Sequence, residues 1–466
     1  MNRYSQKVMR AWADMGPRFL PFADAASKDL PLSRLLRLSL FQVSVGMALV
    51  LLVGTLNRVM IVELGVPASL VATMISLPVL FAPFRALVGF RSDNHRSALG
   101  WRRVPYIWQG TMIQFGGLAI MPFALLVLSG GGNANQWPAW IGHAGAGLAF
   151  LLVGAGLHTT QTAGLALATD LAPTASQPKV VGLMYVMQLL GMIVSALVFG
   201  AALADFSPGR LVQVIQGAAV TTIALNLVAL WKQETRNRAR TAPNRPQPTF
   251  RESWGSFSAG DNAVRRLVAV GLGTMAFSMQ DVLLEPYGGQ VLNMTVGATT
   301  QLTATLAVGG LVGFGLASRV LGRGADPYRM AAQGAMVGVP AFLAIILAAP
   351  LDTQMLFGLG VLLVGFGGGL FAHGTLTAAM HLAPENQIGL ALGAWGAVQA
   401  TAAGIGVTLG AIVRDVVVGM GWLAVPGLGG PAAGFTVVYA LEVALLLATV
   451  IAMAPLLRRA GRPVAA

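Results

Sequence analysis

The sequence predicts an all-α membrane protein with twelve transmembrane helices, arranged as two related halves of six. Three observations lead to this fold class. First, the chain is 55% hydrophobic and only 10% charged, whereas a soluble domain carries about 25% charged residues. Second, its apolar blocks are long enough for helices that cross a bilayer core of about 30 Å, and transmembrane strands would be shorter, alternating segments. Third, one long polar segment separates two sets of six blocks.

Each apolar block predicts one transmembrane helix. The blocks cover residues 36–62, 68–90, 104–130, 139–170, 180–204, 210–231, 265–287, 297–320, 328–349, 354–380, 388–413 and 433–457. The polar segment is rich in proline and charge, which predicts a flexible or only partly helical linker. The predicted organisation is a cytoplasmic N-terminal segment 1–35, a six-helix half 36–231, a cytoplasmic linker 232–262, a second six-helix half 263–457 and a cytoplasmic tail 458–466.

The two halves also resemble each other in sequence. Residues 153–173 align with residues 364–384 at a constant offset of 211, with eight of 21 positions identical. Both segments end in Leu-Ala-Pro. A repeat of six and six spans around a central polar loop is typical of major facilitators, whose binding site lies between the halves near the middle of the membrane.

The basic residues lie mainly on one side of the predicted membrane. They cluster before the first block, after the second, around the linker and in the tail. This is the positive-inside pattern, and it predicts that both termini are cytoplasmic. The net charge of +13 therefore orients the protein and attracts anionic lipid, and it does not predict a nucleic-acid partner. Near the N-terminus, Val8, Trp12, Met15 and Phe19 predict a short helix lying on the membrane surface.

The loop after the second block contains a recognisable signature. Gly89, Asp93, Gly100, Arg102 and Arg103 resemble the loop signature of major facilitators, with a longer spacing between the aspartate and the second glycine. Glycine permits close approach of helices. Asp and Arg side chains join neighbouring helix ends through charge-assisted hydrogen bonds. We therefore expect this signature to clamp the second and third spans.

The same stretch, FRALVGFRSDNHRSALGWRRVPYIWQGTMIQFGGLAIMPFALLVLSG at 84–130, closely resembles the PucC/LhaA family of phototrophic bacteria. Residues 20–67, 169–173 and 280–292 resemble it as well, so the resemblance covers essentially the whole chain. It implies an assembly factor for light-harvesting complexes (LH1, LH2 or both) from the bacteriochlorophyll-delivery branch of the major facilitator superfamily. It also implies an inner, photosynthetic membrane and no catalytic residues.

The resemblance further implies a set of partners. They are the light-harvesting alpha and beta polypeptides, the reaction centre-LH1 complex or a pigment synthase, the lipid membrane, and bacteriochlorophyll a as a non-catalytic cofactor. Bacteriochlorophyll needs an axial ligand for its Mg. The candidate ligands are His158 and His373, which lie inside the fourth and tenth blocks, and the weaker Gln161 and Gln42. The structural alternative is that each bonds a neighbouring helix, which is worth about 1 kcal/mol.

Charged residues inside the apolar blocks indicate a second candidate site. Arg58 lies late in the first block, and Asp281 and Glu285 lie four residues apart in the seventh, on one face of a regular helix. Aligning 56–61 with 279–284 places Arg58 opposite Asp281. An ion at mid-bilayer costs at least about 3 kcal/mol, so we expect Arg58 to pair with one of these carboxylates. The pair is then either a gate, or polar site for a pigment substituent, or a static clamp.

Two functions remain open from the sequence. One is the assembly factor, and the other is a secondary active transporter of a small solute or tetrapyrrole on the same fold. The sequence has no phosphate-binding loop, no carboxylate–histidine metal motif and no cysteine, so we expect no enzyme and no metal except through a pigment. The glycine-rich segments 309–315, 364–374 and 402–411 predict either close helix packing or a flat surface for a macrocycle or partner helices.

Overall fold

The computed structural model describes residues 30–56, 60, 68–97, 99–128, 138–203, 207–237, 241, 248–259, 263–294, 296–381, 387–420 and 432–459. Every regular element in these residues is helical. Ten of the described helical segments are long and apolar enough to cross a membrane, and the protein is a multi-pass membrane protein. The predicted total of twelve spans stays a prediction.

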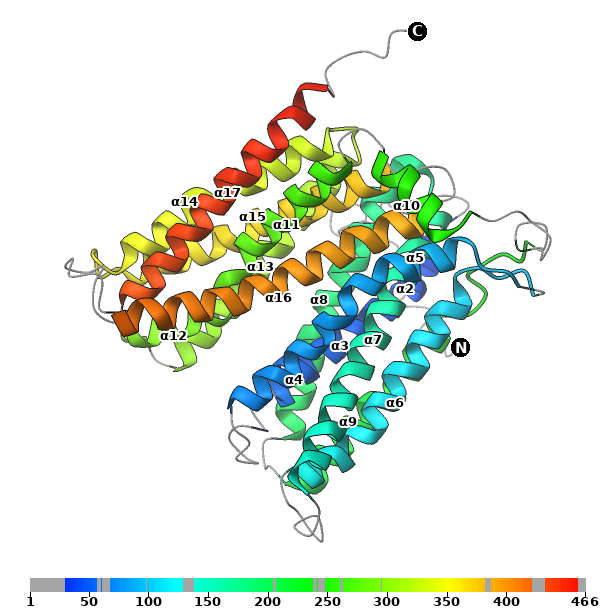
Figure 1. The fold of residues 1–466 in the computed structure, drawn as a ribbon, viewed down its shortest axis with the longest axis horizontal. Coiled ribbons are helices and arrows are strands. Elements are labelled where there is room, and N and C mark those ends of the chain that lie inside the picture. The colour runs from blue at the N-terminus through cyan, green and yellow to red at the C-terminus, as the bar shows by residue number, and fades with distance from the viewer. Residues whose placement is uncertain are drawn as a thin grey trace, which may run out of the picture.

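The helices form two bundles joined by a linker helix (Figure 1). The first bundle contains α2 (Leu32–Leu38), α3 (Leu40–Leu49), the π-helix η2 (Val50–Leu56), α4 (Ala68–Phe81), η4 (Ala82–Phe84), α5 (Arg85–Asp93), α6 (Val104–Leu128), α7 (Ala139–Leu171), η6 (Thr174–Ser176), α8 (Gln177–Ala202) and α9 (Pro208–Leu230). The linker holds α10 (Phe250–Ala259). The predicted surface helix near the N-terminus lies outside the described residues.

The second bundle contains the remaining helices. They are α11 (Ala263–Ser278), the 3-10 helix η7 (Met279–Val282), α12 (Leu284–Gln290), α13 (Val296–Leu321), α14 (Pro327–Ala348), α15 (Gln354–His381), α16 (Ile388–Met420) and α17 (Ala433–Arg459). Most helix limits fall within a few residues of the apolar blocks. The main difference is α16, which continues seven residues beyond the predicted end because its last two turns stay largely apolar around Arg414 and Asp415.

Local sequence explains several helix ends. The Ser207 side chain accepts the backbone N–H of Arg210, and Pro208 occupies the first helical position of α9. Asp326 and Pro327 start α14 in the same way, with Asp326 accepting the N–H of Tyr328. Both are N-caps followed by proline, a residue whose missing N–H costs nothing at that position.

The two bundles share hydrophobic clusters at one end of the molecule. We call this the linker end; it holds the end of α5, the start of α16 and α10. Leu167 and Met184 of the first bundle pack there in one cluster with Leu376, Leu392 and Trp395 of the second. The remainder of each bundle has its own core. The described contacts therefore close the protein at the linker end.

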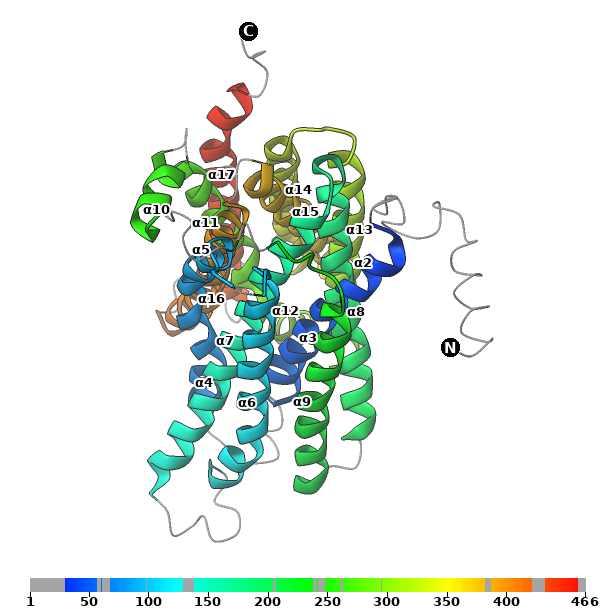
Figure 2. The same cartoon turned by 90° about the vertical axis from the view of Figure 1, so that its right-hand side faces the viewer.

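The linker helix α10 lies across the seam between the bundles. Figure 2 shows α10 beside α5 and α11, and both pairs are in contact. The Phe250 ring meets Phe90 of α5 edge-on with 5.4 Å between centroids, and it stacks on Trp254 at 6.0 Å. The linker is thus partly helical, and an aromatic cluster fixes its helix against both bundles.

The glycine-rich segments pack against each other inside the second bundle. A Cβ on Gly309 of α13 would collide with the Leu362 carbonyl of α15, and one on Gly369 of α15 would meet the Gly310 carbonyl. On α16, Gly406 lies against the Met275 backbone of α11. Glycine is needed at these positions because helix backbones touch there. Of the two alternatives, the structure supports close helix packing.

Candidate functional site

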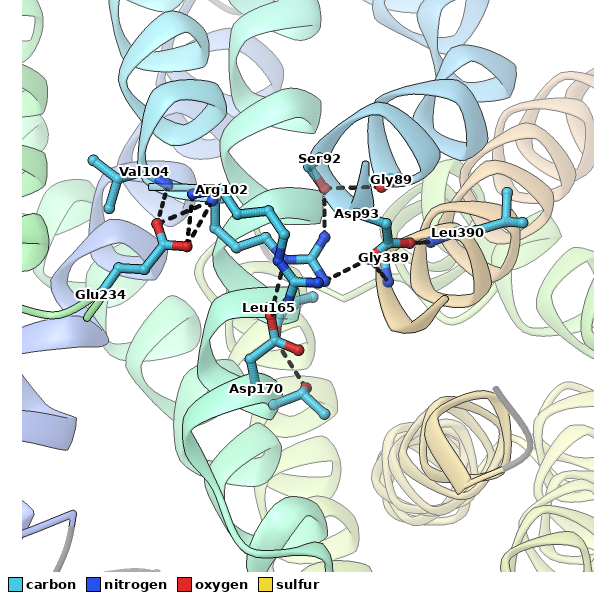
Figure 3. Close-up of polar contacts among 12 residues, drawn as sticks. Gly89, Ser92, Asp93, Arg102, Val104, Leu165, Asp170, Glu234, Gly389 and Leu390 are labelled. Atoms are coloured by element: carbon cyan, nitrogen blue, oxygen red, sulfur yellow. Dashed lines mark hydrogen bonds and ion pairs between the residues drawn. The ribbon is translucent and has the colours of Figure 1, made fainter. Parts of the chain in front are cut away.

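A charged cluster at the linker end brings Asp93, Arg102 and Asp170 together (Figure 3). Arg103 lies at its centre. Its side chain is 1% exposed, and Nη2 lies 2.5 Å from Asp93 Oδ1 of α5. Its Nε lies 3.0 Å from Asp170 Oδ2 at the end of α7, and Nη1 donates to Ser92 Oγ at 2.6 Å. Burial by itself lowers the pKa of Arg103, but the negative charges of Asp170 and Asp93 outweigh it and raise that pKa above its ordinary value.

The same cluster fixes the start of α6. Arg102 Nη2 lies 2.6 Å from Asp170 Oδ2. The Glu234 carboxylate, in the linker after α9, accepts the backbone N–H groups of Arg102, Arg103 and Val104 at 2.8, 3.0 and 2.9 Å. A helix start leaves such N–H groups without partners and carries a partial positive charge, so a carboxylate stabilises it. Glu234 thereby ties the linker to the loop before α6.

Asp93 extends the cluster into the other bundle. Its Oδ1 accepts the backbone N–H of Gly389 at 3.0 Å, and Oδ2 accepts that of Leu390 at 2.8 Å. These are the first turns of α16, so one aspartate joins Arg103 to the N-terminus of a helix from the other bundle. The approach requires glycine on both sides, because a Cβ on Gly89 would collide with the Gly389 carbonyl.

The loop signature thus has a wider role than a clamp between neighbouring spans. Asp93, Arg102 and Arg103 come together, Gly89 permits the contact of α5 with α16, and Gly100 shapes the loop. Gly100 has a φ of +84°, a value that favours glycine, and its carbonyl accepts the Asn237 N–H at 2.9 Å. These ion pairs and hydrogen bonds hold the two bundles together at the linker end. All charges of the cluster are matched, which leaves little capacity for a ligand.

A second polar cluster lies deeper between the bundles, around Arg85. This side chain is 2% exposed. Its Nε donates to Thr162 Oγ1 at 3.0 Å and its Nη2 to Gln161 Oε1 at 3.1 Å, both on α7. Nη1 reaches the Gly396 carbonyl of α16, in the other bundle, at 3.3 Å. No carboxylate in the described part of the chain lies within ion-pair distance of Arg85.

The surroundings of Arg85 are polar but neutral. Gln161 extends the hydrogen-bond network to α8, because its Nε2 donates to Gln188 Oε1 at 3.1 Å. Tyr185 of α8 faces Arg85 and stacks on Phe314 of α13, with 5.2 Å between centroids. Arg85 therefore holds a positive charge among neutral acceptors where the two bundles meet.

His158 belongs to this second cluster. It is half-buried on α7, close enough to Arg85 for the two charges to interact, and it hydrogen-bonds the Pro78 carbonyl of α4. Its Nδ1 has no hydrogen-bond partner among the described residues. Pro78 lies inside α4. The geometry leaves one imidazole nitrogen buried beside a cation and without a hydrogen-bond partner in the part of the chain that the structure describes.

The other predicted ligand candidates lie elsewhere. Gln161 is engaged on both sides of its amide by Arg85 and Gln188. His373 is fully buried on α15, with its ring 5.6 Å from that of Phe314. Gln42 is fully buried on α3, and neither amide atom has a hydrogen-bond partner among the described residues.

Arg58 lies outside the described residues, so its predicted pairing with a carboxylate stays a prediction. Asp281 and Glu285 do not lie in one continuous α-helix, so the helical spacing that predicts a shared face does not apply to them. The seventh span is not one α-helix there, since η7 separates α11 from α12 and the Leu283 N–H bonds the Gln280 carbonyl in a 3-10 turn. Pro286 contributes to this break, because it cannot donate the hydrogen bond that a continuous helix would require.

Sequence reasoning missed four charged residues. Arg85, Asp170, Glu234 and Glu442 are not among the predicted site residues. A signal existed for three of them: Arg85, Asp170 and Glu442 are isolated charges within or at the end of apolar blocks, where a charge is costly. Glu234 gave no such signal, because it lies in a charged linker and its partners are about 130 residues away in sequence.

The fold resembles solved transporters of the major facilitator superfamily. A crystal structure of a bacterial homologue of the iron transporter ferroportin in an outward-facing state superposes with a TM-score of 0.71 at 14% sequence identity, covering 92% of this chain and 99% of that one. The major facilitator transporter FucP in the outward conformation gives a TM-score of 0.63 at 14% identity, covering 94% and 99%. These likenesses confirm the all-α, major-facilitator-like fold.

Relatives match over nearly the whole chain. Protein PucC of Rhodovulum sulfidophilum is 65% identical over 90% of this chain and 92% of its own length. Protein PucC of Cereibacter sphaeroides is 59% identical over 99% of both. A more distant relative, the bacteriochlorophyll synthase 44.5 kDa chain of Rhodobacter capsulatus, is 28% identical over 82% of this chain and 87% of its own. Residues 55–461 match the model of the PUCC protein family, and the chain therefore belongs to that family.

Proposed function

We propose that this protein is an assembly factor for bacterial light-harvesting complexes, which binds newly inserted antenna polypeptides and holds bacteriochlorophyll between its two bundles. Membership of the PUCC family and a distant relative named as a bacteriochlorophyll synthase chain support a role in the photosynthetic apparatus. The observation that supports the pigment is the His158 Nδ1, which is buried beside Arg85 and has no hydrogen-bond partner among the described residues.

The residues around His158 fit a pigment. Metal-ligating histidines commonly donate their second ring N–H to a carbonyl or carboxylate, which orients the ring, and the Pro78 carbonyl provides this contact here. Bacteriochlorophyll would supply a Mg²⁺ ion that accepts an axial nitrogen. The Arg85 guanidinium has five N–H donors, of which three make the contacts described above. The remaining donors suit a keto or ester oxygen.

A pigment-content measurement tests this proposal. The protein is produced in a phototrophic bacterium and purified in mild detergent, and its absorption spectrum and co-purifying polypeptides are recorded. We expect bound bacteriochlorophyll and antenna polypeptides, and a clear loss of pigment in His158→Asn. The matched control is His143→Gln, an exposed histidine on the same helix. An unchanged pigment content in His158→Asn would show that His158 is not a ligand. His373 and Gln42 would then be the remaining candidates.

The fold similarity favours one alternative, a secondary active transporter of a small solute or tetrapyrrole. Two solved transporters with this fold, the ferroportin homologue and FucP, are in outward states, and the described contacts of this protein close the linker end. A colourless, partner-free protein that shows saturable uptake of a solute in proteoliposomes would favour this alternative over assembly.

The orientation is also part of the proposal. The basic clusters beside α5, α9 and the C-terminal end of α17 support a cytoplasmic linker end under the positive-inside rule. We propose the photosynthetic inner membrane as its location. A reporter active only in the cytoplasm, fused after residue 466, should be active; a reporter active only in the periplasm should be silent.

A further inference from the structure

The seventh span is broken inside the second bundle. α11 ends at Ser278, the 3-10 turn η7 follows, and α12 begins at Leu284. The first span is irregular too, because α3 continues into the π-helix η2. Interrupted membrane helices in corresponding positions of the two halves are where ion and substrate sites of transporters occur.

Asp281 lies in the break. Asp281 is exposed, whereas Gln280 and Leu283 on either side of it are buried. An exposed carboxyl group at such a place can exchange protons with its surroundings. Its Oδ1 accepts a hydrogen bond of 2.5 Å from Gln280 Nε2.

Glu442 of α17 lies behind Asp281. It is fully buried, and neither carboxyl oxygen has a side-chain hydrogen-bond partner among the described residues. The polar group that acts on it is the Gln280 backbone N–H, and Asp281 lies close enough to interact with it electrostatically. The hydroxyl of Tyr439, one turn earlier on α17, is also buried without a partner and interacts with Glu442. These three groups lie near one another where α17 packs on η7.

The described residues offer Glu442 no cation. On α16, Arg414 is engaged with Asp415 at 2.7 Å and Gln290 at 2.9 Å. The basic and titratable residues of the other helices that pack on α17 lie at the linker end, namely Arg265 and Arg266 of α11 and Tyr328 and Arg329 of α14. From η7 only Asp281 faces it, and that charge is negative. An isolated carboxylate inside a bilayer costs at least about 3 kcal/mol, and a bound proton removes this cost.

We propose that Glu442 is a proton-binding site of the second bundle, loaded and emptied through Asp281 at the break in the seventh span. The proton leaves the Glu442 carboxyl group towards the Asp281 carboxylate, which is exposed and releases it to water, and loading runs in reverse. No cation among the described residues would match a charge on Glu442 between α11 and α17, so proton loss weakens the packing of these helices. Protonation is thereby linked to the conformation of the bundle.

Infrared difference spectroscopy tests the proposal on the whole protein in detergent, without pigment or antenna polypeptides, so its outcome is independent of the proposed function. At neutral pH we expect a protonated-carboxyl C=O band that shifts in D₂O. Glu442→Gln, close in shape to the native residue, should lose this band. Asp281→Asn should keep the band and slow its exchange with D₂O. Asp415→Asn, at an exposed carboxylate, is the control that should leave the band and its exchange unchanged.

Three results would overturn the proposal. One is a native protein without a protonated-carboxyl band, and another is a band that persists in Glu442→Gln. The third is loss of the band when Na⁺, K⁺ or Ca²⁺ is added at constant pH, which would assign the site to a metal cation. Because Asp281→Asn keeps Glu442 itself, its exchange rate still tests the path if Glu442→Gln fails to fold.

Discussion

The linker end and the interior of the second bundle both bury acidic side chains, but they surround them differently. At the linker end, Asp93 has Arg103 at 2.5 Å and two backbone N–H groups of α16 within 3.0 Å. In the second bundle, Glu442 is equally buried and has a second acid, Asp281, as its charged neighbour. Arg85 is intermediate, since it is a buried cation that bonds only neutral acceptors.

This difference separates charged groups that stabilise the structure from charged groups that can bind a ligand or a proton. A buried ion that is matched by an opposite charge and hydrogen bonds is stabilising only as a set, and removing one member leaves the other unpaired. A buried group without a counter-charge costs free energy in the resting protein, and such groups cluster at functional sites. The linker-end cluster therefore closes the protein, and Arg85, His158 and Glu442 are the groups with capacity for a ligand or a proton.

The largest effect is expected from breaking the matched cluster. Arg103→Met leaves Asp93, whose side chain is 1% exposed, without its cation. We expect destabilisation of about 3–5 kcal/mol, measured as a fall in the thermal unfolding temperature in detergent. The control is Asp415→Asn, which removes an exposed ion pair worth about 0–1 kcal/mol. Equal unfolding temperatures for the two variants would show that the cluster does not hold the linker end.

The second effect tests the close contact that lets Asp93 reach α16. A Cβ on Gly389 would lie against the Gly89 carbonyl, Arg103 Nη1 and Asp93 Oδ1. Gly389→Ala should therefore force α5 and α16 apart and cost about 1–3 kcal/mol. In Gly358→Ala, on α15, the new methyl group meets nothing within 4 Å, and helix propensity should stabilise the protein by up to about 1 kcal/mol. The two substitutions should shift the unfolding temperature in opposite directions.

A smaller effect is expected at Arg85. Arg85→Met removes a buried cation that has no carboxylate partner in the described part of the chain, so no ion is left unpaired. The cost comes from neutral acceptors that lose a donor, partly offset by the relief of burying a charge. We expect a loss of stability of about 1 kcal/mol or less, accompanied by reduced pigment content. A loss as large as that of Arg103→Met would reveal a counter-charge and place Arg85 among the charged groups that stabilise the structure.

The smallest effect concerns pH at the edge of the linker-end cluster. Half-burial lowers the pKa of His95 below its ordinary value of 6.5, and the negative charge of Glu234 only partly opposes this. The folded state thus favours neutral His95 more than the unfolded state does. Its contribution to stability is complete above pH 6.5 and declines as the pH falls below that value.

The measurement for His95 is the unfolding temperature of the native protein and of His95→Asn between neutral and mildly acidic pH. The native protein should lose slightly more stability on acidification than the variant. Parallel curves for both proteins would mean that His95 does not contribute to the pH dependence.

Much of the fold follows from local sequence. The block 139–170 became α7 at Ala139–Leu171, and 354–380 became α15 at Gln354–His381. Apolar runs of this length can satisfy their backbone hydrogen bonds in a bilayer only as helices, so their positions need no knowledge of neighbours. The breaks in the first and seventh spans were less visible. Pro286 hinted at the second, but the pattern of apolar residues continues through both.

The amino-acid sequence by itself determined the membrane class, the helix positions, the repeated halves and the family of this protein. Only the tertiary structure decided which charges are matched. Asp93 meets Leu390 and Arg85 meets Gly396 across sequence separations of 297 and 311 residues. Within the described part of the chain, the charged neighbour of Glu442 is Asp281 and not a base. Hydropathy is a local property that adds up along the chain. The state of a buried charge depends instead on the few atoms that the fold places within hydrogen-bond distance of it.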